Sequence, residues 1–498
     1  MKPKAETPTH QVAISTGVQF VGKILVMLLG LAAIGLITRY LGVTGFGQYT
    51  TVFAYVSFLS VFADFGFFAV LVTQLAKGRD DPSKIVSNIM TLRAVAAVAV
   101  YLIGFAIGFL LPYPDAVKLG IGIIAAAWFG QSVNQTLVGV FQVKQAMARP
   151  VVADILGRVA VLGLVFAAVS NGWSFQGILM AYLVGAFVTL ALNFYFVRVF
   201  VAVSLAADLV YWRKVIDLAL PMAAVLVLGF IYFKADTVIL SLLKGPDDVG
   251  IYGVPYKLVE VLLVFPSIFM GTVLPFITLY LATHNATKMA NAFGRAFHFL
   301  SLIGLPALLV GSLLAKQLVA LLGGQEFVSA ATVFLKGQAV AGPLVLQVLL
   351  FAVFLSYLSH LTTYVVVAAG RQSSLVLPNL IFAFGNIGLN FLLIPYYSYL
   401  AAAVITVLTE LAVLAVSWRI IWLKIGRFVP DGRYLLKLLL ANLILSAAIF
   451  PLREVGLLFV LVFAAILYGF LALLLRLVTR QDLAEVLQFR GGASATPA

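Results

Sequence analysis

The sequence predicts an all-α protein that crosses a membrane many times, and two observations carry this prediction. The chain of 498 residues is 63% hydrophobic and only 10% charged, whereas soluble domains are about half apolar and a quarter charged. Its apolar runs are about 20 residues long or longer, which is the length of a membrane-spanning helix. Backbone polar groups in a bilayer must be satisfied within the structure, and no alternating ten-residue pattern of barrel strands occurs.

The apolar runs divide into about 14 predicted spans. The opening segment is weakly basic, and the run after it is too long for a signal-peptide core, so we expect a short cytoplasmic tail before a retained first span. The amphipathic segment 201–214 is predicted to lie on the membrane surface. The tenth span is too long for one crossing, so its start is expected in the interface or outside. The predicted spans are 13–39, 46–74, 86–111, 116–141, 150–170, 176–198, 215–243, 250–281, 291–314, 330–369, 374–395, 399–422, 433–451 and 456–478.

The basic residues orient this stack of helices. With the N-terminus inside, 22 of the 32 lysines and arginines fall on the inner side, six fall outside, and four lie within spans. This bias predicts that both ends are cytoplasmic and that the protein is a multi-pass protein of the cytoplasmic (inner) membrane. The net charge of +14 is then explained by topology and contact with anionic lipid, and no nucleic-acid partner is expected.

An internal repeat is visible at an offset of 203 residues. Segment 46–62 aligns with segment 249–265, with identical glycines, tyrosines and apolar residues at matched positions. Each segment follows the first span of a six-span unit, and an even number of spans gives the two units the same orientation. We therefore expect a parallel repeat about an axis along the membrane normal, with a cavity between two six-helix lobes. The predicted organisation is an N-lobe over 1–205, a C-lobe over 206–427, and two further spans with a cytoplasmic tail over 428–498.

Three stretches resemble a known family: "ITRYLGVTGFGQY", "DTVILSLLKGPDDVGIYGVPYKLVE" and "VVVAAGRQSSL…NIGLNFLLIPYYSYLAAAVIT". They are similar to bacterial oligosaccharide flippases of the polysaccharide biosynthesis family, within the multidrug/oligosaccharidyl-lipid/polysaccharide exporter superfamily. The resemblance covers nearly the whole chain. It implies two six-helix lobes around a cavity, alternating access, and a polyprenyl-diphosphate-linked sugar as cargo. Membrane lipids, and polymerases or glycosyltransferases of the same pathway, are the implied partners.

Other functions stay open at this stage. A cation-coupled multidrug exporter of the same superfamily is one alternative, although twelve spans are usual there. A membrane enzyme such as a polysaccharide polymerase or ligase is less favoured, because every loop is short and no polar catalytic cluster lies outside the lipid. A scaffold without transport is disfavoured by charges within the spans. Relatives that move peptidoglycan precursor carry several cavity arginines, whereas the deep charges here are balanced in sign.

Nothing in the sequence predicts a catalytic site, a cofactor or a metal. There are no cysteines, and four scattered histidines have no metal-ligand spacing. The stretch "GVQFVGKI" over 17–24 matches a phosphate-binding loop until Ile24, where a serine or threonine should bind Mg²⁺. Because it also lies within an apolar helix, we attribute the match to coincidence.

Lys23, Asp64 and Arg93 form the first candidate cluster. Each lies nine or ten residues from the predicted cytoplasmic end of its span, which is about 14–15 Å deep and near the midplane. A phosphate-bearing lipid needs cationic donors, and Asp64 can neutralise one of them. Substrate contact and purely structural pairing are both open readings.

The second candidate cluster lies in the predicted hairpin of spans seven and eight. Asp236 and Lys257 are at similar depths on its two sides, about 12–14 Å below the outer surface, so we expect them to meet. Glu260 shares the helix face of Lys257. Lys234 is two residues from Asp236 and points elsewhere, so it is expected to snorkel outward. A structural salt bridge and a cavity wall are both open readings.

The remaining candidates are uncharged or isolated side chains. Gln131 and Gln135 lie on one stripe of a predicted helix and suit sugar hydroxyls, although amides also join helices within membranes. Glu410 lies mid-span, with His360 at a depth from which it can reach the carboxyl group. Proton coupling and a neutral hydrogen-bonded glutamic acid are both open for this pair.

Overall fold

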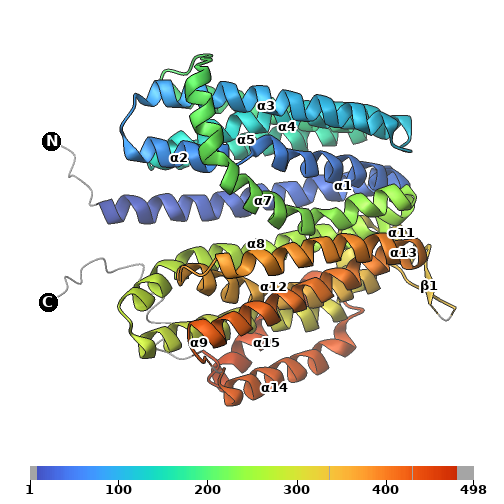
Figure 1. The fold of residues 1–498 in the computed structure, drawn as a ribbon. Helices are drawn as coiled ribbons and strands as arrows, with labels where there is room; N and C mark the ends of the chain where they lie inside the picture. The colour runs from blue at the N-terminus through green and yellow to red at the C-terminus, as the bar shows by residue number, and fades with distance from the viewer. Residues whose placement is uncertain (1–7, 336, 429, 479–498) are drawn as a thin grey trace, which may run out of the picture. The chain divides into compact units, whose positions relative to one another are not determined.

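The computed structural model describes residues 8–335, 337–428 and 430–478, and these residues are almost entirely helical (Figure 1). The prediction of an all-α polytopic membrane protein is confirmed. A short hairpin and one 3-10 turn (Phe450–Leu452) interrupt the helices. The helices are α1 (Pro8–Asp64), α2 (Phe67–Lys77), α3 (Pro82–Leu110), α4 (Asp115–Val143), α5 (Ala148–Ser170), α6 (Phe175–Val197), α7 (Leu209–Leu243), α8 (Pro246–Ala282), α9 (Ala286–Leu313), α10 (Ala315–Gly323), α11 (Glu326–Ser329), α12 (Gly342–Ala368), α13 (Ser373–Lys424), α14 (Gly432–Ile449) and α15 (Leu457–Leu474), with strands β1 (Phe334–Leu335) and β2 (Gln338–Ala339).

Eleven helices of the described chain are long and apolar enough to cross a membrane. Two of them are longer than one crossing: α1 has 57 residues and α13 has 52. Each contains a kink, at Gly42 with φ 64° and at Ser398 with φ 48°, and both values lie in the left-handed region that breaks a helix. The exact number of 14 crossings stays a prediction. α12 begins only at Gly342, so the first part of the overlong tenth span is the β1–β2 hairpin.

The chain divides into two compact units, Met1–Gly250 and Ile251–Ala498. In the first unit, α7 packs against α1, α2 and α3, and its Val215 joins a buried apolar cluster with Leu71, Ile89 and Leu137. In the second unit, α14 and α15 share a buried cluster with α9. The lobe boundaries expected from the repeat stay a prediction.

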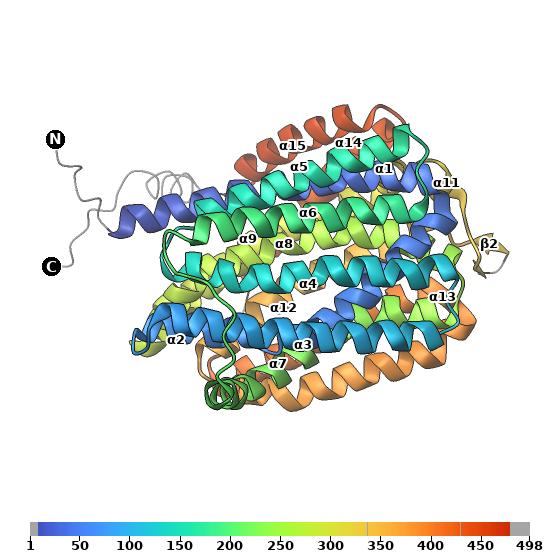
Figure 2. The same cartoon turned by 90° about the horizontal axis from the view of Figure 1, so that it is seen from above.

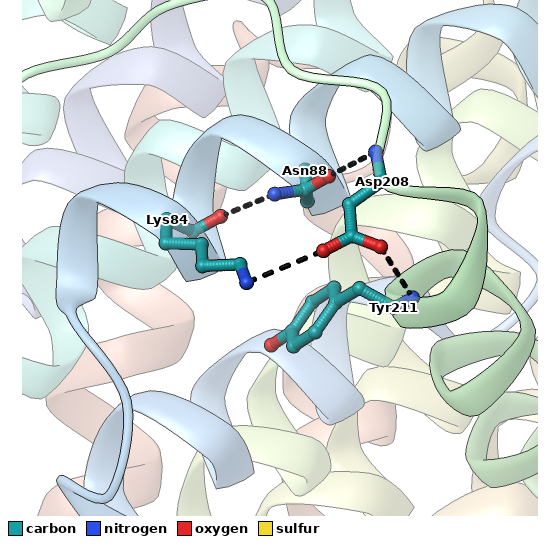
Figure 3. Close-up of polar contacts among 4 residues, drawn as sticks. All are labelled: Lys84, Asn88, Asp208 and Tyr211. Atoms are coloured by element: carbon teal, nitrogen blue, oxygen red, sulfur yellow. Dashed lines mark hydrogen bonds and ion pairs between the residues drawn. The ribbon is translucent and has the colours of Figure 1, made fainter.

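The linker between α6 and α7 is fixed to α3. Figures 1 and 2 show that the first turns of α7 run across the long axes of α2 and α3. Asp208 caps α7 by accepting from the backbone N–H of Tyr211 at 3.1 Å, and its other oxygen lies 3.2 Å from Nζ of Lys84 (Figure 3). The backbone N–H of Asp208 donates to Oδ1 of Asn88 at 2.9 Å. Asn88 is itself held by donating to the carbonyl of Lys84.

Two more side chains of α3 extend this attachment. The backbone N–H of Ser204 donates to Oγ of Ser87 at 3.1 Å, and that of Ala206 donates to Oγ1 of Thr91 at 3.1 Å. Alternate N–H groups of an extended segment point the same way, so residues 204, 206 and 208 all donate to α3. We call this attachment the strap.

The turn within α1 meets the turn between α7 and α8. Oγ1 of Thr44 donates to Oδ1 of Asp247 at 2.5 Å. These two residues are 203 positions apart, which is the offset of the sequence repeat. A contact between repeat-related residues is the arrangement expected where a two-fold axis passes between them.

Two glycines allow the backbones of these two turns to approach each other closely. A Cβ on Gly47 would collide with the carbonyl oxygen of Pro246, and a Cβ on Gly250 would collide with that of Val43. The contact is reciprocal, because both glycines and both carbonyl residues are also related by the offset of 203. Only glycine has no side chain to hold the two backbones apart. We call this region, with Thr44 and Asp247, the turn contact.

Candidate functional site

Arg93 is the centre of a polar site within the first unit. It lies on α3 with only 1% of its side chain exposed. Its Nη2 donates to Oδ1 of Asp64 at 2.5 Å and to Oε1 of Gln135 at 2.6 Å. The three residues come from α3, α1 and α4, so tertiary packing assembles the site. Removing one member of such a buried pair costs about 3–5 kcal/mol.

The site is open on one side. Asp64 ends α1, since Phe65 and Gly66 have φ values of 44° and 78° and break the helix there. Its side chain is 29% exposed, and Gln135 is exposed as well. Charged side chains within a membrane bundle face a partner or a water-filled cavity, because contact with lipid is costly. We infer that Asp64 and Gln135 border water.

Arg93 has donor capacity to spare. Its Nε and Nη1 are buried, and no group in the described chain accepts a hydrogen bond from them. A guanidinium is always charged and has five N–H donors in a fixed plane. Phosphate and carboxylate oxygens match that plane and bind it through two bonds at once. The site therefore has the chemistry to hold an oxyanion.

Lys23 does not join the site that its depth predicted. It is exposed and forms no ion pair with any residue that the structure describes. The preceding residue, Gly22, packs tightly against Val151 of α5. Because Gly22 faces α5, its neighbour is turned about 100° around the helix from that contact. Asp64 and Arg93 meet as predicted, and Lys23 is separate.

Gln131 lies one turn from Gln135 on the same face of α4. It is exposed, and its Oε1 accepts from Nδ2 of Asn134 at 3.5 Å. Asn134 is buried and accepts from Nδ2 of Asn193 on α6 at 2.7 Å. The asparagines thus join helices, while the two glutamines remain available on the exposed face. The helix-joining reading therefore applies to the asparagines, and contact of Gln131 and Gln135 with sugar stays a prediction.

The second cluster is divided between the two units. Asp236 is buried in the first unit, and its Oδ1 accepts from the backbone N–H of Thr237 at 2.7 Å. In the second unit, Nζ of Lys257 lies 2.7 Å from Oε2 of Glu260, one turn along α8. Pairing between Asp236 and Lys257 stays a prediction. The side chain of Lys234 lies outside the described residues.

The coupling candidates lie between α12 and α13. Glu410 is buried and accepts from Oγ of Ser359 at 2.8 Å. Nδ1 of His360 instead donates to a backbone carbonyl one turn earlier on its own helix, at 2.8 Å. Nδ2 of Asn386 donates to Oγ1 of Thr409, the residue before Glu410, at 3.0 Å. Glu410 thus belongs to a hydrogen-bonded layer between two helices.

The sequence interpretation missed two features near these residues. An aromatic cluster of Tyr49, Phe53, Trp128 and Tyr182 joins α1, α4 and α6. Trp128 precedes Gln131 and Gln135 by three and seven residues. This helical spacing could have predicted that the ring and the two amides share one face. The turn contact was the second feature, and the repeat offset alone pairs its residues.

The comparisons with known proteins agree with this architecture. Residues 12–280 match a family described as "Polysaccharide biosynthesis protein". The structure is similar to that of the lipid II flippase MurJ in an inward closed conformation, with a TM-score of 0.74 and 11% identity, covering 93% of this chain and 99% of that chain. It is also similar to an inward-facing multidrug resistance MATE family transporter of the MOP superfamily, with a TM-score of 0.62 and 14% identity, covering 79% of this chain and 93% of that chain.

A MOP superfamily transporter from Pyrococcus furiosus is a further structural match, with a TM-score of 0.50 and 16% identity, covering 82% of this chain and 93% of that chain. Among curated proteins, none matches the sequence. Identities this low show a shared fold and leave the cargo open. The family match covers more than half of the chain, and the chain belongs to the polysaccharide biosynthesis protein family and has the fold of MOP-superfamily transporters.

Proposed function

We propose that the protein is a flippase that moves a polyprenyl-diphosphate-linked oligosaccharide across the cytoplasmic membrane for assembly of a cell-surface polysaccharide. It works by alternating access, without enzymatic chemistry. Both termini are cytoplasmic, and glycosyltransferases and a polymerase of the same pathway act before and after it.

The observation that carries this proposal is the site at Arg93. A buried guanidinium holds Asp64 and Gln135 through Nη2 and keeps two further nitrogens for another acceptor. A diphosphate supplies charged oxygens, and it is the common part of all such lipid-linked sugars. The exposed amides of Gln131 and Gln135 add donors and acceptors suited to sugar hydroxyls.

The turn contact supports the alternating-access part of the proposal. Repeat-related residues meet at turns that the basic-residue distribution assigns to the outer side. A carrier that opens to one side at a time needs a closed end, and this meeting provides one. Superposition of spans 1–6 on spans 7–12 by a rotation about the membrane normal is the further expectation.

A second candidate function is cation-coupled export of a drug. The Glu410 layer favours it, because a buried carboxyl group hydrogen-bonded to Ser359 is a site that a proton or cation can occupy. The two candidates differ in cargo, and Glu410 can serve coupling in either one.

Flipping by purified protein in proteoliposomes tests the proposal. The probe is a fluorescent polyprenyl diphosphate that carries a trisaccharide. Arg93→Ala should slow flipping about ten- to hundredfold, since a hydrogen bond to a charged group contributes about 1.5–3 kcal/mol. Arg93→Lys should recover only part of the rate, because lysine keeps the charge and loses the two-bond geometry. Asp64→Asn should bind the probe more tightly and release it more slowly.

Arg79→Ala is the matched control, because Arg79 is exposed in the turn between α2 and α3. It should flip the probe at the wild-type rate. The double variant Arg93→Leu/Asp64→Leu removes both charges, so it separates loss of the site from the cost of an unpaired buried charge. If folded Arg93→Ala protein flips the probe as fast as the wild type, Arg93 does not bind the cargo. If the wild type moves a cationic drug and not the lipid, the second candidate is correct.

A further inference from the structure

Four aromatic rings form a continuous cluster in the first unit, on α1, α4 and α6. The rings of Phe53 and Trp128 are edge to face, with centroids 5.4 Å apart, and Phe53 meets Tyr182 in the same way at 4.8 Å. Tyr49 lies 4.3 Å from Phe53, and its hydroxyl donates to that of Tyr182 at 2.8 Å. Phe53 of α1, itself packed against Tyr49 and Tyr182, therefore holds Trp128 in place before any ligand arrives.

The cluster lies on the same wall as Arg93 and its partners. Asp64 follows Phe53 by eleven residues on α1, and Gln135 follows Trp128 by seven residues on α4. Eleven and seven residues are close to three and two whole helical turns. The rings and the ion pair thus share one face of each helix and are about 10–16 Å apart along it.

The exposed part of the cluster faces the same space as the amides. Tyr49 and Tyr182 are buried, whereas Phe53 and Trp128 are half-buried. Gln131 lies between Trp128 and Gln135 on this face, and both glutamines are exposed. Since exposed amides mark the side of α4 that borders water, we infer that the accessible part of Trp128 borders the same water.

We propose that Trp128, supported by Phe53, is a stacking platform for a sugar ring of the cargo. This inference rests on the proposed function. A pyranose has one face of C–H groups, which packs on an aromatic face while its hydroxyls remain at the rim. Trp128 supplies that face, and Gln131 is placed to hydrogen-bond the hydroxyls. The separation from Arg93 exceeds one sugar ring, so the platform contacts a sugar beyond the one joined to the diphosphate.

The test compares two probes on the full-length protein in nanodiscs. One probe is bare polyprenyl diphosphate, and the other carries a trisaccharide. Trp128→Leu keeps an apolar side chain, although a smaller one, and removes the aromatic face, whereas Trp128→Phe restores a ring. Trp173→Ala is the matched control, because Trp173 is an exposed tryptophan of the same unit. Binding is measured by native mass spectrometry across a range of probe concentrations.

We expect Trp128→Leu to bind the bare lipid like the wild type and the trisaccharide lipid at least tenfold more weakly. Trp128→Phe should recover most of that loss, and Trp173→Ala should bind both probes normally. Normal binding of both probes by Trp128→Leu would overturn the platform and leave the proposed function standing. An equal loss for both probes would also overturn it, because the ring would then act through the fold. If the wild type binds neither probe, the proposed function fails with it.

Discussion

The strap and the turn contact both join segments that are distant in the sequence, but they use different interactions. Each joins residues before position 92 to residues after position 203. The strap uses three backbone N–H groups, at residues 204, 206 and 208, and an ion pair from Asp208 to Lys84. The turn contact includes a side-chain hydrogen bond from Thr44 to Asp247 and a close approach of two backbones at glycines.

This difference indicates which attachment moves. Each hydrogen bond of the strap contributes about 0.5–1.5 kcal/mol, so separating the strap would be opposed at several positions together. In the turn contact, the hydrogen bond from Thr44 to Asp247 joins two exposed side chains, which water can satisfy when the contact opens. We therefore expect the strap to persist through a transport cycle and the turn contact to open.

Cross-linking of the turn contact should give the largest effect, because a covalent bond prevents the contact from opening. The same method also tests the strap. The natural chain has no cysteine, so the Thr44→Cys/Asp247→Cys pair can be oxidised without competing thiols. We expect flipping in proteoliposomes to stop on oxidation and to return on reduction. Ser87→Cys/Ser204→Cys is the matched pair across the strap, where the two Oγ atoms are 3.4 Å apart. It should flip at the same rate whether oxidised or reduced.

Two results would reverse this interpretation. Full activity of the oxidised Thr44→Cys/Asp247→Cys protein would show that the turn contact does not open. Loss of activity in the oxidised strap pair would show that the strap does. Mass shifts of alkylated samples report the extent of each cross-link.

Gly47→Ala should give an intermediate effect. Its methyl group would collide with the carbonyl of Pro246, so the turn contact could not close without a backbone shift. Overpacking of this kind costs about 1–3 kcal/mol, and we expect flipping to fall about five- to a hundredfold. Gly30→Ala lies on the same helix with open space around its Cβ, and it should be neutral. Equal initial rates for the two variants would remove the requirement for close approach.

Asp208→Asn should give the smallest effect, and the size of this effect depends on pH. The backbone N–H of Tyr211 and then the Lys84 side chain lower the pKa of Asp208 below its ordinary value. A carboxyl group with a lowered folded-state pKa stabilises the fold above its unfolded pKa of about 3.9, and that contribution is lost as pH falls through the folded-state pKa.

The measurement is the thermal midpoint of purified protein between neutral and acid pH. Wild type should melt slightly higher than Asp208→Asn at pH 7, and the two should converge in acid, with flipping unchanged. A gap that widens towards acid pH would contradict the assignment. Asp115→Asn is the control, since Asp115 lies at the end of α4 with a side chain that is 96% exposed.

The sequence predicted well how deep each charged residue lies along its span. It predicted poorly which face of the helix the residue occupies. Asp64, Arg93 and Lys23 were grouped because each lies at a similar distance along its span. The structure joins the first two and leaves Lys23 apart. Distance along a helix follows from residue count, whereas the face that packs depends on neighbours such as Val151. For Gln135, sugar contact and hydrogen bonding between helices were both open, and its contact with Arg93 needed the same missing information.

The helical architecture was predictable because apolar length is a property of single segments. The start of the tenth span was predictable only in part. Its length placed the first residues of 330–369 in the interface or outside, but it did not indicate the β1–β2 hairpin that they form. The turn contact was missed for another reason. The repeat was found from identical residues, and Thr44 and Asp247 differ in type although they occupy related positions.

The pairing of Arg93 with Asp64 has a consequence for how a cargo is held. The guanidinium keeps its charge at every physiological pH, and Asp64 is an anion already bound to it. In the proposed cycle a diphosphate therefore competes with a resident carboxylate, so loading is an ion exchange. The site's net charge changes less than it would around an isolated arginine, and the cargo is attracted less strongly. Weak net attraction suits a carrier, because the carboxylate that the cargo displaces on entry can displace the cargo in turn on the far side.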